Sequence, residues 1–414
     1  MLGIPAGVRG AGLLLALVAT GADARADSPG PLHVISGADR EFLTRHWRRP
    51  IEPQGTAPAA FSPLERSLAP ESCGTCHPAQ LADWKTALHS RGMGPGLTGQ
   101  LVELNRTDPE GARACLTCHA PLAEQSEQIQ GPRGVVSNTD FDPRLQRQGL
   151  TCAGCHVRRH QRFGPPPREG SLSSQVPRST LPHNGATWSG AFLRSEFCSS
   201  CHQFAPGDLR LGGKPLENTY EEWKASPAAR QGLHCQHCHM PDRRHLWRGI
   251  HDPEMVKSGL EIALTTGRPR YRPGEDVDAT LTIRSVRVGH YFPTYVTPRV
   301  VIRGELLETG GTPIPGSARE GVVGRDVPLD LSREVSDTRI PPGGRFSFSY
   351  RQRLAQPGLA LRVTVTVFPD HFYTRFFEAL LDGGAGEGTA QIRQALEATR
   401  RSRFVIFSRD IPLT

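Results

Sequence analysis

The sequence has little of the apolar material from which a chain of its length normally builds a core. Only 37% of its 414 residues are hydrophobic and 7% are aromatic, whereas it contains 44 glycines and 36 prolines. A chain of this composition buries a large interior only if something else contributes apolar volume. The composition therefore excludes an ordinary globular core.

Long hydrophobic runs are also missing beyond the first residues. One apolar run, residues 11–22, follows Arg9 and precedes the small residues Ala24 and Ala26, which is the pattern of a cleaved secretory signal peptide. The run is too short to span a bilayer as a helix. We expect a signal peptide over residues 1–26, a periplasmic mature chain and no stable transmembrane segment, with an uncleaved anchor as the alternative.

No cysteine stands alone, because all ten belong to five copies of Cys-x-x-Cys-His. The copies are Cys73, Cys76 and His77; Cys115, Cys118 and His119; Cys152, Cys155 and His156; Cys198, Cys201 and His202; and Cys235, Cys238 and His239. In c-type haem attachment the two thiols bind the porphyrin and the adjoining histidine is the proximal iron ligand. Zinc sites and disulfides also use cysteine pairs, but neither explains a histidine after every pair. We predict five haem c groups.

The predicted haems also explain the composition and the charge. Five porphyrins between residues 73 and 239 would supply much of the missing apolar interior. The formal net charge of +8 would by itself favour a polyanionic partner. Ionised haem propionates would offset most of that charge, so we expect no nucleic-acid partner.

The second ligand of each iron is predicted to be histidine, because the chain has 16 histidines and only 4 methionines. The distal candidates are His89, His183, His245, His251 and His290. One of His245 and His251 could instead be a hydrogen-bond partner. His290 lies far from any cysteine, so an iron bond from it would join two domains.

The chain is expected to be multidomain, with a pentahaem cytochrome domain of mostly short helices and loops plus a C-terminal antiparallel β-sandwich. Apolar residues at helical spacing follow Pro78, whereas alternation typical of strands begins near Gly259. The predicted parts are the signal peptide at 1–26, a Pro-rich segment at 27–70, the pentahaem domain at 71–256, the β-sandwich at 257–370, and a C-terminal helix and strand at 371–414.

Two segments resemble known periplasmic multihaem cytochromes. The run from Cys73 to His77 followed by Trp84 and His89 resembles the repeat of the tetrahaem cytochrome that takes electrons from hydroxylamine oxidoreductase. Residues 235–254 with 289–294 resemble multihaem cytochromes that have a C-terminal β-domain. The resemblance covers roughly residues 70–300 and implies that His89, His183 and His290 are distal ligands. The fifth motif and the strand domain depart from the tetrahaem pattern, so haem order does not transfer.

Three functions remain open. Five six-coordinate haems would make an electron carrier that exchanges electrons with periplasmic redox proteins. One open iron would instead make an oxidoreductase of a small nitrogen or sulfur oxyanion, with residues 158–160 as the nearest cationic cluster. A haem subunit of a larger, quinol-linked or other respiratory complex is the third reading. We expect electron transfer and leave enzymatic activity undecided.

Overall fold

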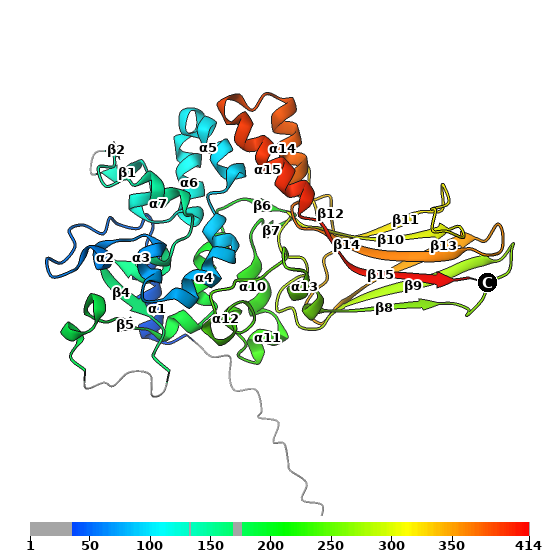
Figure 1. Ribbon diagram of the computed structural model, residues 1–414, viewed down its shortest axis with the longest axis horizontal. Coiled ribbons are helices and arrows are strands. Elements are labelled where there is room, and N and C mark those ends of the chain that lie inside the picture. The colour runs from blue at the N-terminus through cyan, green and yellow to red at the C-terminus, as the bar shows by residue number, and fades with distance from the viewer. Residues whose placement is uncertain (1–34, 132–133, 169–175, 414) are drawn as a thin grey trace, which may run out of the picture.

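The computed structural model describes residues 35–131, 134–168 and 176–413, so the predicted signal peptide at 1–26 lies outside the described residues. Figure 1 shows a body of short helices from which a long, sheet-rich arm projects. The prediction of a helical region followed by a separate sheet-rich region is confirmed. Within the described ranges, no helix is both long enough and apolar enough to cross a bilayer.

The body is built from short helices, most of which begin at a proline. Proline occupies the first turn of α2 to α7, α11 and α13, where its missing N–H costs no hydrogen bond. The helices are α1 Gly37–His46, α2 Pro63–Arg66, α3 Pro70–Gly74, α4 Pro78–Thr86, α5 Pro95–Thr107, α6 Pro109–His119, α7 Pro143–Arg147, α8 Cys152–His156, α9 Glu196–His202, α10 Thr219–Lys224, α11 Pro227–Arg230, α12 Cys235–His239 and α13 Pro253–Gly259. The high proline content is thus used to start helices.

Short strands connect parts of this body. They are β1 Gln128–Gly131, β2 Gly134–Ser137, β3 Val157–Arg158, β4 Gln161–Gly164, β5 Thr187–Trp188, β6 Arg210–Leu211 and β7 Lys214–Pro215. Strands β1 with β2, β3 with β4, and β6 with β7 pair antiparallel, and β5 lies parallel to β4. None is long enough to provide a sheet core.

The arm consists of two antiparallel sheets. Their strands are β8 Leu260–Thr266, β9 Asp276–Ser285, β10 Arg299–Leu307, β11 Arg319–Asp326, β12 Ser336–Asp337, β13 Arg345–Arg353, β14 Ala360–Phe368 and β15 Phe404–Pro412. One sheet has the order β12-β11-β10-β14-β15 and the other β13-β9-β8. Alternate residues of β9, β10 and β14 are buried, as their alternating sequences predict.

Hydrophobic packing differs between the two parts. The two sheets share one continuous core that includes Ile283, Ile302, Tyr350 and Val365. In the described part of the helical body, buried apolar residues form only small separate clusters, such as the one around Leu122. This is the packing expected of a region whose interior is shared with a large cofactor.

Two C-terminal helices return from the arm to the body. They are α14 His371–Asp382 and α15 Thr389–Arg401, and Figure 1 shows them beside α5. The contact is close, because a Cβ on Gly388 would clash with the carbonyl oxygen of Gly99. Within the segment 371–414, where a C-terminal helix and strand were expected, lie α15 and β15, and β15 completes the five-stranded sheet. Helix α14 was not predicted.

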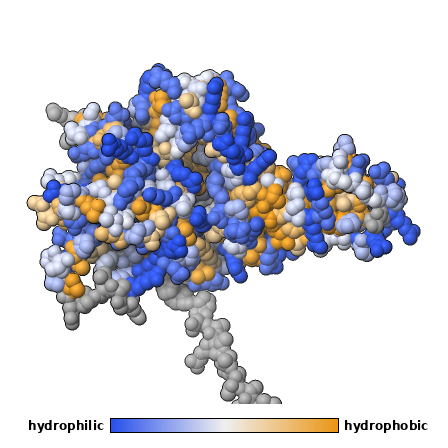
Figure 2. Space-filling view, viewed as in Figure 1, coloured by the Kyte–Doolittle hydropathy of each residue, from blue (hydrophilic) through white to orange (hydrophobic). Residues whose placement is uncertain are grey.

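The arm docks on the body through the loop between β9 and β10, residues 286–298. Glu222 of α10 accepts hydrogen bonds from Arg339 of the arm at 2.8 Å and from the backbone N–H of Tyr291 at 3.1 Å. The side chains of Arg339 and Glu222 are only 3% and 4% exposed. Figure 2 shows hydrophobic residues gathered where the arm meets the body. This loop therefore lies at a buried junction.

Candidate functional site

Four of the five Cys-x-x-Cys-His motifs lie within helices, and the first continues from α3 through a turn in which the N–H of His77 bonds to the carbonyl of Cys73 at 3.0 Å. Helices α8 and α12 begin at the first cysteine and end at the histidine, and α6 and α9 also end at their motif histidines. Residues i, i+3 and i+4 of a helix share one face. The two thiols and the imidazole of a motif therefore project to the same side, and all ten thiols are free.

The motif histidines are held by the ring nitrogen that would not bind iron. The Nδ1 atoms of His119, His156 and His239 lie 2.6–2.8 Å from backbone carbonyl oxygens, to which they donate. That of His202 lies 2.6 Å from the hydroxyl of Tyr295. A neutral imidazole that donates through Nδ1 presents the lone pair of Nε2. Burial lowers the pKa of His156 and His202 to about 4, so these rings are neutral at neutral pH.

Three motif histidines face a second histidine. The ring centres of His156 and His245 are 6.2 Å apart. Those of His202 and His89, and those of His239 and His290, are each 6.3 Å apart. Two imidazoles that bind one metal ion from opposite sides would have centres about 6.2 Å apart, since each metal–nitrogen bond is about 2.0 Å and each nitrogen lies about 1.1 Å from its ring centre.

Two of the three facing histidines are held through Nδ1 as the motif histidines are, and the third, His89, is buried. The Nδ1 atoms of His245 and His290 lie 3.0 and 2.9 Å from the backbone carbonyls of Arg243 and Tyr291. Burial lowers the pKa of His89 to about 3, and its Nδ1 is buried with no hydrogen-bond partner. Paired thiols beside opposed neutral imidazoles fit a c-type haem with two axial histidines. The described residues contain no cluster of three His, Cys, Asp or Glu side chains arranged to hold a metal ion.

The other two predicted distal residues differ in which ring nitrogen is engaged. Nδ1 of His183 lies 2.9 Å from the carbonyl oxygen of Gly185. Burial lowers the pKa of His183, and His77 is one of the neighbouring groups whose charge lowers it further. His183 is therefore near the first motif with Nε2 directed elsewhere. In contrast, Nε2 of His251 lies 3.0 Å from both carboxylate oxygens of Asp370. That contact occupies the nitrogen that an iron ligand needs.

The second motif has no such facing histidine within the described ranges. Most of the remaining described histidines use Nε2 for another contact: His46 with the carbonyl of Cys155, His160 with that of Gly55, and His371 with Arg299. His234 accepts a hydrogen bond from the N–H of Ser195 at the start of α9, and His237 accepts one from the N–H of His234. His33 lies outside the described residues. The cationic cluster at 158–160 does not converge on one point, because Arg158 binds carbonyls of α8 and β3 while Arg159 pairs with Glu52 at the surface.

The motifs touch one another through their thiols. Cys73 and Cys152, Cys118 and Cys201, and Cys198 and Cys235 lie close enough together that the members of each pair shift one another's thiol pKa. Cys155 is also close enough to Cys198 to affect it electrostatically. The first and third motifs are therefore adjacent, and the fourth motif adjoins the second, third and fifth. Sequence spacing could not reveal this order.

Several residues that hold the site were not predicted. Arg49, from the Pro-rich segment, donates to the Sγ atoms of Cys118 and Cys201 at 3.4 and 2.9 Å and to the backbone carbonyls of Thr117 and Ser200. Asp83 accepts two hydrogen bonds from Arg244 and one from the N–H of His245. A lone arginine or aspartate carries no motif, so no sequence signal marked these residues or Tyr295.

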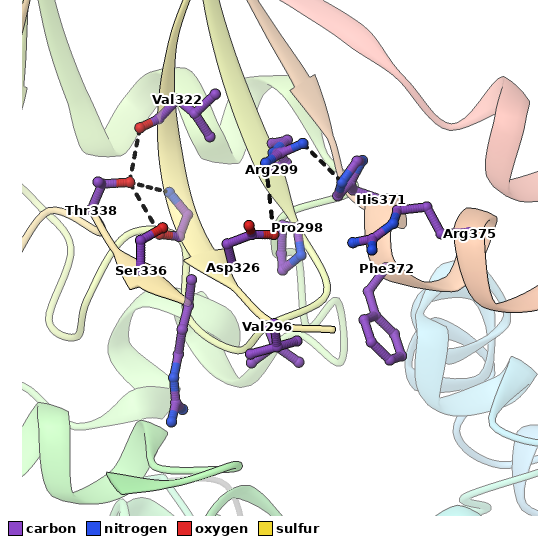
Figure 3. Close-up of a pocket in the computed structure, with 13 residues that line it drawn as sticks. Val296, Pro298, Arg299, Val322, Asp326, Ser336, Thr338, His371, Phe372 and Arg375 are labelled. Carbon is purple, nitrogen blue, oxygen red and sulfur yellow. Dashed lines mark hydrogen bonds and ion pairs between the residues drawn. The ribbon is translucent and has the colours of Figure 1, made fainter. Parts of the chain in front are cut away.

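A cavity of about 80 Å³ lies elsewhere, where α14 meets the base of the arm. Figure 3 shows the side chains of Arg299 and His371 facing each other across it, and an ion pair from Arg299 to Asp326. Burial, followed by the charges of Arg299 and Arg375, lowers the pKa of His371 to about 4. No motif residue lines this cavity, so it is separate from the paired histidines.

The family model described as "Cytochrome c554 and c-prime" matches residues 72–157, which include the first three motifs. A crystal structure of a penta-haem cytochrome c552 from Thermochromatium tepidum shares the fold, with a TM-score of 0.60 at 17% identity over 85% of this chain and 100% of that chain. An ApaA protein from Bordetella pertussis aligns with 37% of this chain and 93% of its own at 14% identity, but its TM-score of 0.17 carries no weight. A search of the curated proteins found no significant match. The family match and the shared fold together support a multihaem c-type cytochrome.

Proposed function

We propose that the protein transfers electrons through five covalently attached c-type haems, four of which are held between two histidines. Bound haem supplies an iron that alternates between Fe(III) and Fe(II). The observation that carries the proposal is the set of three imidazole pairs at 6.2–6.3 Å. Each pair joins a motif histidine to one of the distal residues expected from the sequence.

The proposed axial pairs are His156 with His245, His202 with His89, His239 with His290, and His77 with His183. The first three rest on ring separation, and the fourth rests on the free Nε2 of His183 and its proximity to His77. His251 is left out of the set because its Nε2 contacts Asp370. Two histidines fixed by backbone hydrogen bonds hold the same geometry in both oxidation states, which suits electron transfer.

The contacts between motifs support a connected path. The first motif adjoins the third, and the fourth adjoins the second, third and fifth. We infer a branched arrangement in which the fourth motif is the junction. A branched path would let electrons enter and leave at different motifs, which is what a carrier between periplasmic redox proteins or within a respiratory complex requires.

The C-terminal domain would contribute one ligand. The single core shared by its two sheets supports an antiparallel β-sandwich. His290 lies in its docking loop, and the ring planes of His290 and His239 are 10° apart. In this proposal the iron at the fifth motif binds both parts of the chain, so that loading of the haem stabilises the docked arm.

A second candidate function follows from the second motif. Across the described ranges, no histidine with an available Nε2 faces His119. A haem at this motif would then have an open position, and the protein would also react with a small nitrogen or sulfur oxyanion. Such an open site is compatible with the proposed electron transfer, because the second motif forms a side branch that adjoins the fourth motif.

Two measurements on the exported protein test the proposal. The mass of the mature chain should exceed that of the polypeptide by five haem groups. Carbon monoxide should shift the reduced absorption spectrum of about one haem in five. Fewer haems, or carbon monoxide binding at several of them, would contradict the proposed ligation, and no binding at all would remove the second candidate function.

A further inference from the structure

The fourth motif occupies a central position and has unusual histidine contacts. Its Cys198 and Cys201 adjoin the fifth and second motifs. In two of the three imidazole pairs, both Nδ1 atoms contact backbone carbonyls. In the His202 and His89 pair, one Nδ1 contacts a phenol and the other is buried without a partner.

The phenol belongs to Tyr295, which the β9–β10 loop brings from the arm to the body. Its hydroxyl lies 2.6 Å from Nδ1 of His202. Thr219 of α10 bonds through its hydroxyl with Thr294, the residue before Tyr295, at 2.6 Å. Among the residues that the structure describes, Tyr295 provides the one hydrogen bond to either ring of this pair.

The backbone at Tyr295 is strained. Its φ is +66°, a left-handed conformation that bulky side chains rarely adopt because it is strained. Such strain persists only where the surroundings impose it, and it occurs often at functional sites. In this loop the strained conformation coincides with the contact to His202.

We propose that Tyr295 is a positioning residue that sets the reduction potential of the haem at the fourth motif. The inference rests on the proposed function. When Nε2 of His202 binds iron, the neutral ring carries its proton on Nδ1, so Nδ1–H donates to the Tyr295 oxygen. Donation through Nδ1 makes Nε2 a stronger electron donor to iron. A stronger donor stabilises Fe(III), so removing the phenol should raise the potential.

The test is a spectroelectrochemical titration of the five-haem holoprotein carrying Tyr295→Phe. One component should become about tenfold easier to reduce, which is about 59 mV for a one-electron couple. The other components should change less than twofold. A His89→Met variant identifies the fourth-motif component, because methionine in place of histidine raises the potential of that haem.

Tyr350→Phe is the matched control. Its hydroxyl is also buried and donates to the carbonyl of Ser317 at 3.0 Å, within the core of the arm. This variant should leave all five potentials unchanged. If Tyr295→Phe fails to fold, Tyr295→Gly, which removes the phenol and adopts the positive φ of this position without strain, should shift the same component in the same direction.

Two results would overturn the inference: an unchanged fourth-motif component, or a shift confined to another component. Either could occur in a protein that has five haems and low-spin spectra, so the proposed carrier function would stand. A wild-type protein without haem at the fourth motif would instead refute the proposed function.

Discussion

The docking of the arm can be tested at one buried ion pair. In Arg339→Met, the carboxylate of Glu222 keeps its neutral donor, the N–H of Tyr291, but loses its cation. Both charged side chains are at most 4% exposed. Removing one member of a buried pair typically costs about 3–5 kcal/mol, because the other charge is left uncompensated. Asp337, the second partner of Arg339, retains Lys214 at 2.5 Å, so the cost should come mainly from Glu222.

The assay is guanidinium unfolding of the holoprotein, followed by the absorption of high-spin haem. Tyr291 directly follows His290, so undocking would separate that histidine from His239 and produce high-spin haem. We expect Arg339→Met to lower the free energy of this transition by about 3–5 kcal/mol. The double variant Glu222→Gln with Arg339→Met should recover part of the loss, because neither charge remains.

Arg303→Met is the matched control for Arg339→Met. Arg303 also pairs with two carboxylates of the arm, Glu305 and Glu320, but its side chain is 43% exposed. Such pairs contribute about 1 kcal/mol or less. If Arg339→Met cost no more than Arg303→Met, the buried pair would not hold the arm in place.

Three further variants test other parts of the site. His290→Ala should convert about one haem in five to a high-spin, carbon-monoxide-binding form, and an unaltered spectrum would remove it as a ligand. Arg49→Met should lower the free energy of unfolding by about 2–4 kcal/mol in a denaturant titration, because the hydrogen bonds of Arg49 to two motifs are lost. The neighbouring side chain of Arg48 is exposed, so Arg48→Met should change this free energy little. Glu217→Gln tests a pH effect. Burial raises the pKa of Glu217 from 4.5 to about 8. Between pH 4.5 and about 8 the folded chain therefore binds more protons than the unfolded chain, and the free energy of unfolding falls as the pH rises. The variant should lose that dependence, and an unchanged slope would contradict the assignment.

The sequence predicted those parts of the molecule that repeat or alternate. Cysteine pairs followed by histidine marked all five motifs, since that chemistry requires a fixed local spacing. The alternation that begins near Gly259 predicted strands in the region that contains β9 and β14, because each of these strands has one face in the core. The helix after Pro78 was predicted as well, although it ends at Thr86 and His89 lies in a following 3₁₀ turn, Leu88–Arg91.

Contacts between distant segments could not be predicted in the same way. The pairing of His89 with His202 joins residues more than 100 positions apart, and no pattern near either one specifies the other. The choice between His245 and His251 depends on which ring nitrogen is occupied, which only the folded chain defines. Helix α14 was not predicted, although Pro369 and Asp370, residues typical of a turn and of a helix start, separate it from β14.

Near-infrared magnetic circular dichroism of the fully oxidised protein tests the central claim most directly, because it counts low-spin haems by their pair of axial ligands. The proposed ligand pairs predict four haems with two histidines each and one haem with a different signal. Fewer than four bis-histidine haems, or any haem ligated by histidine and methionine, would contradict the account.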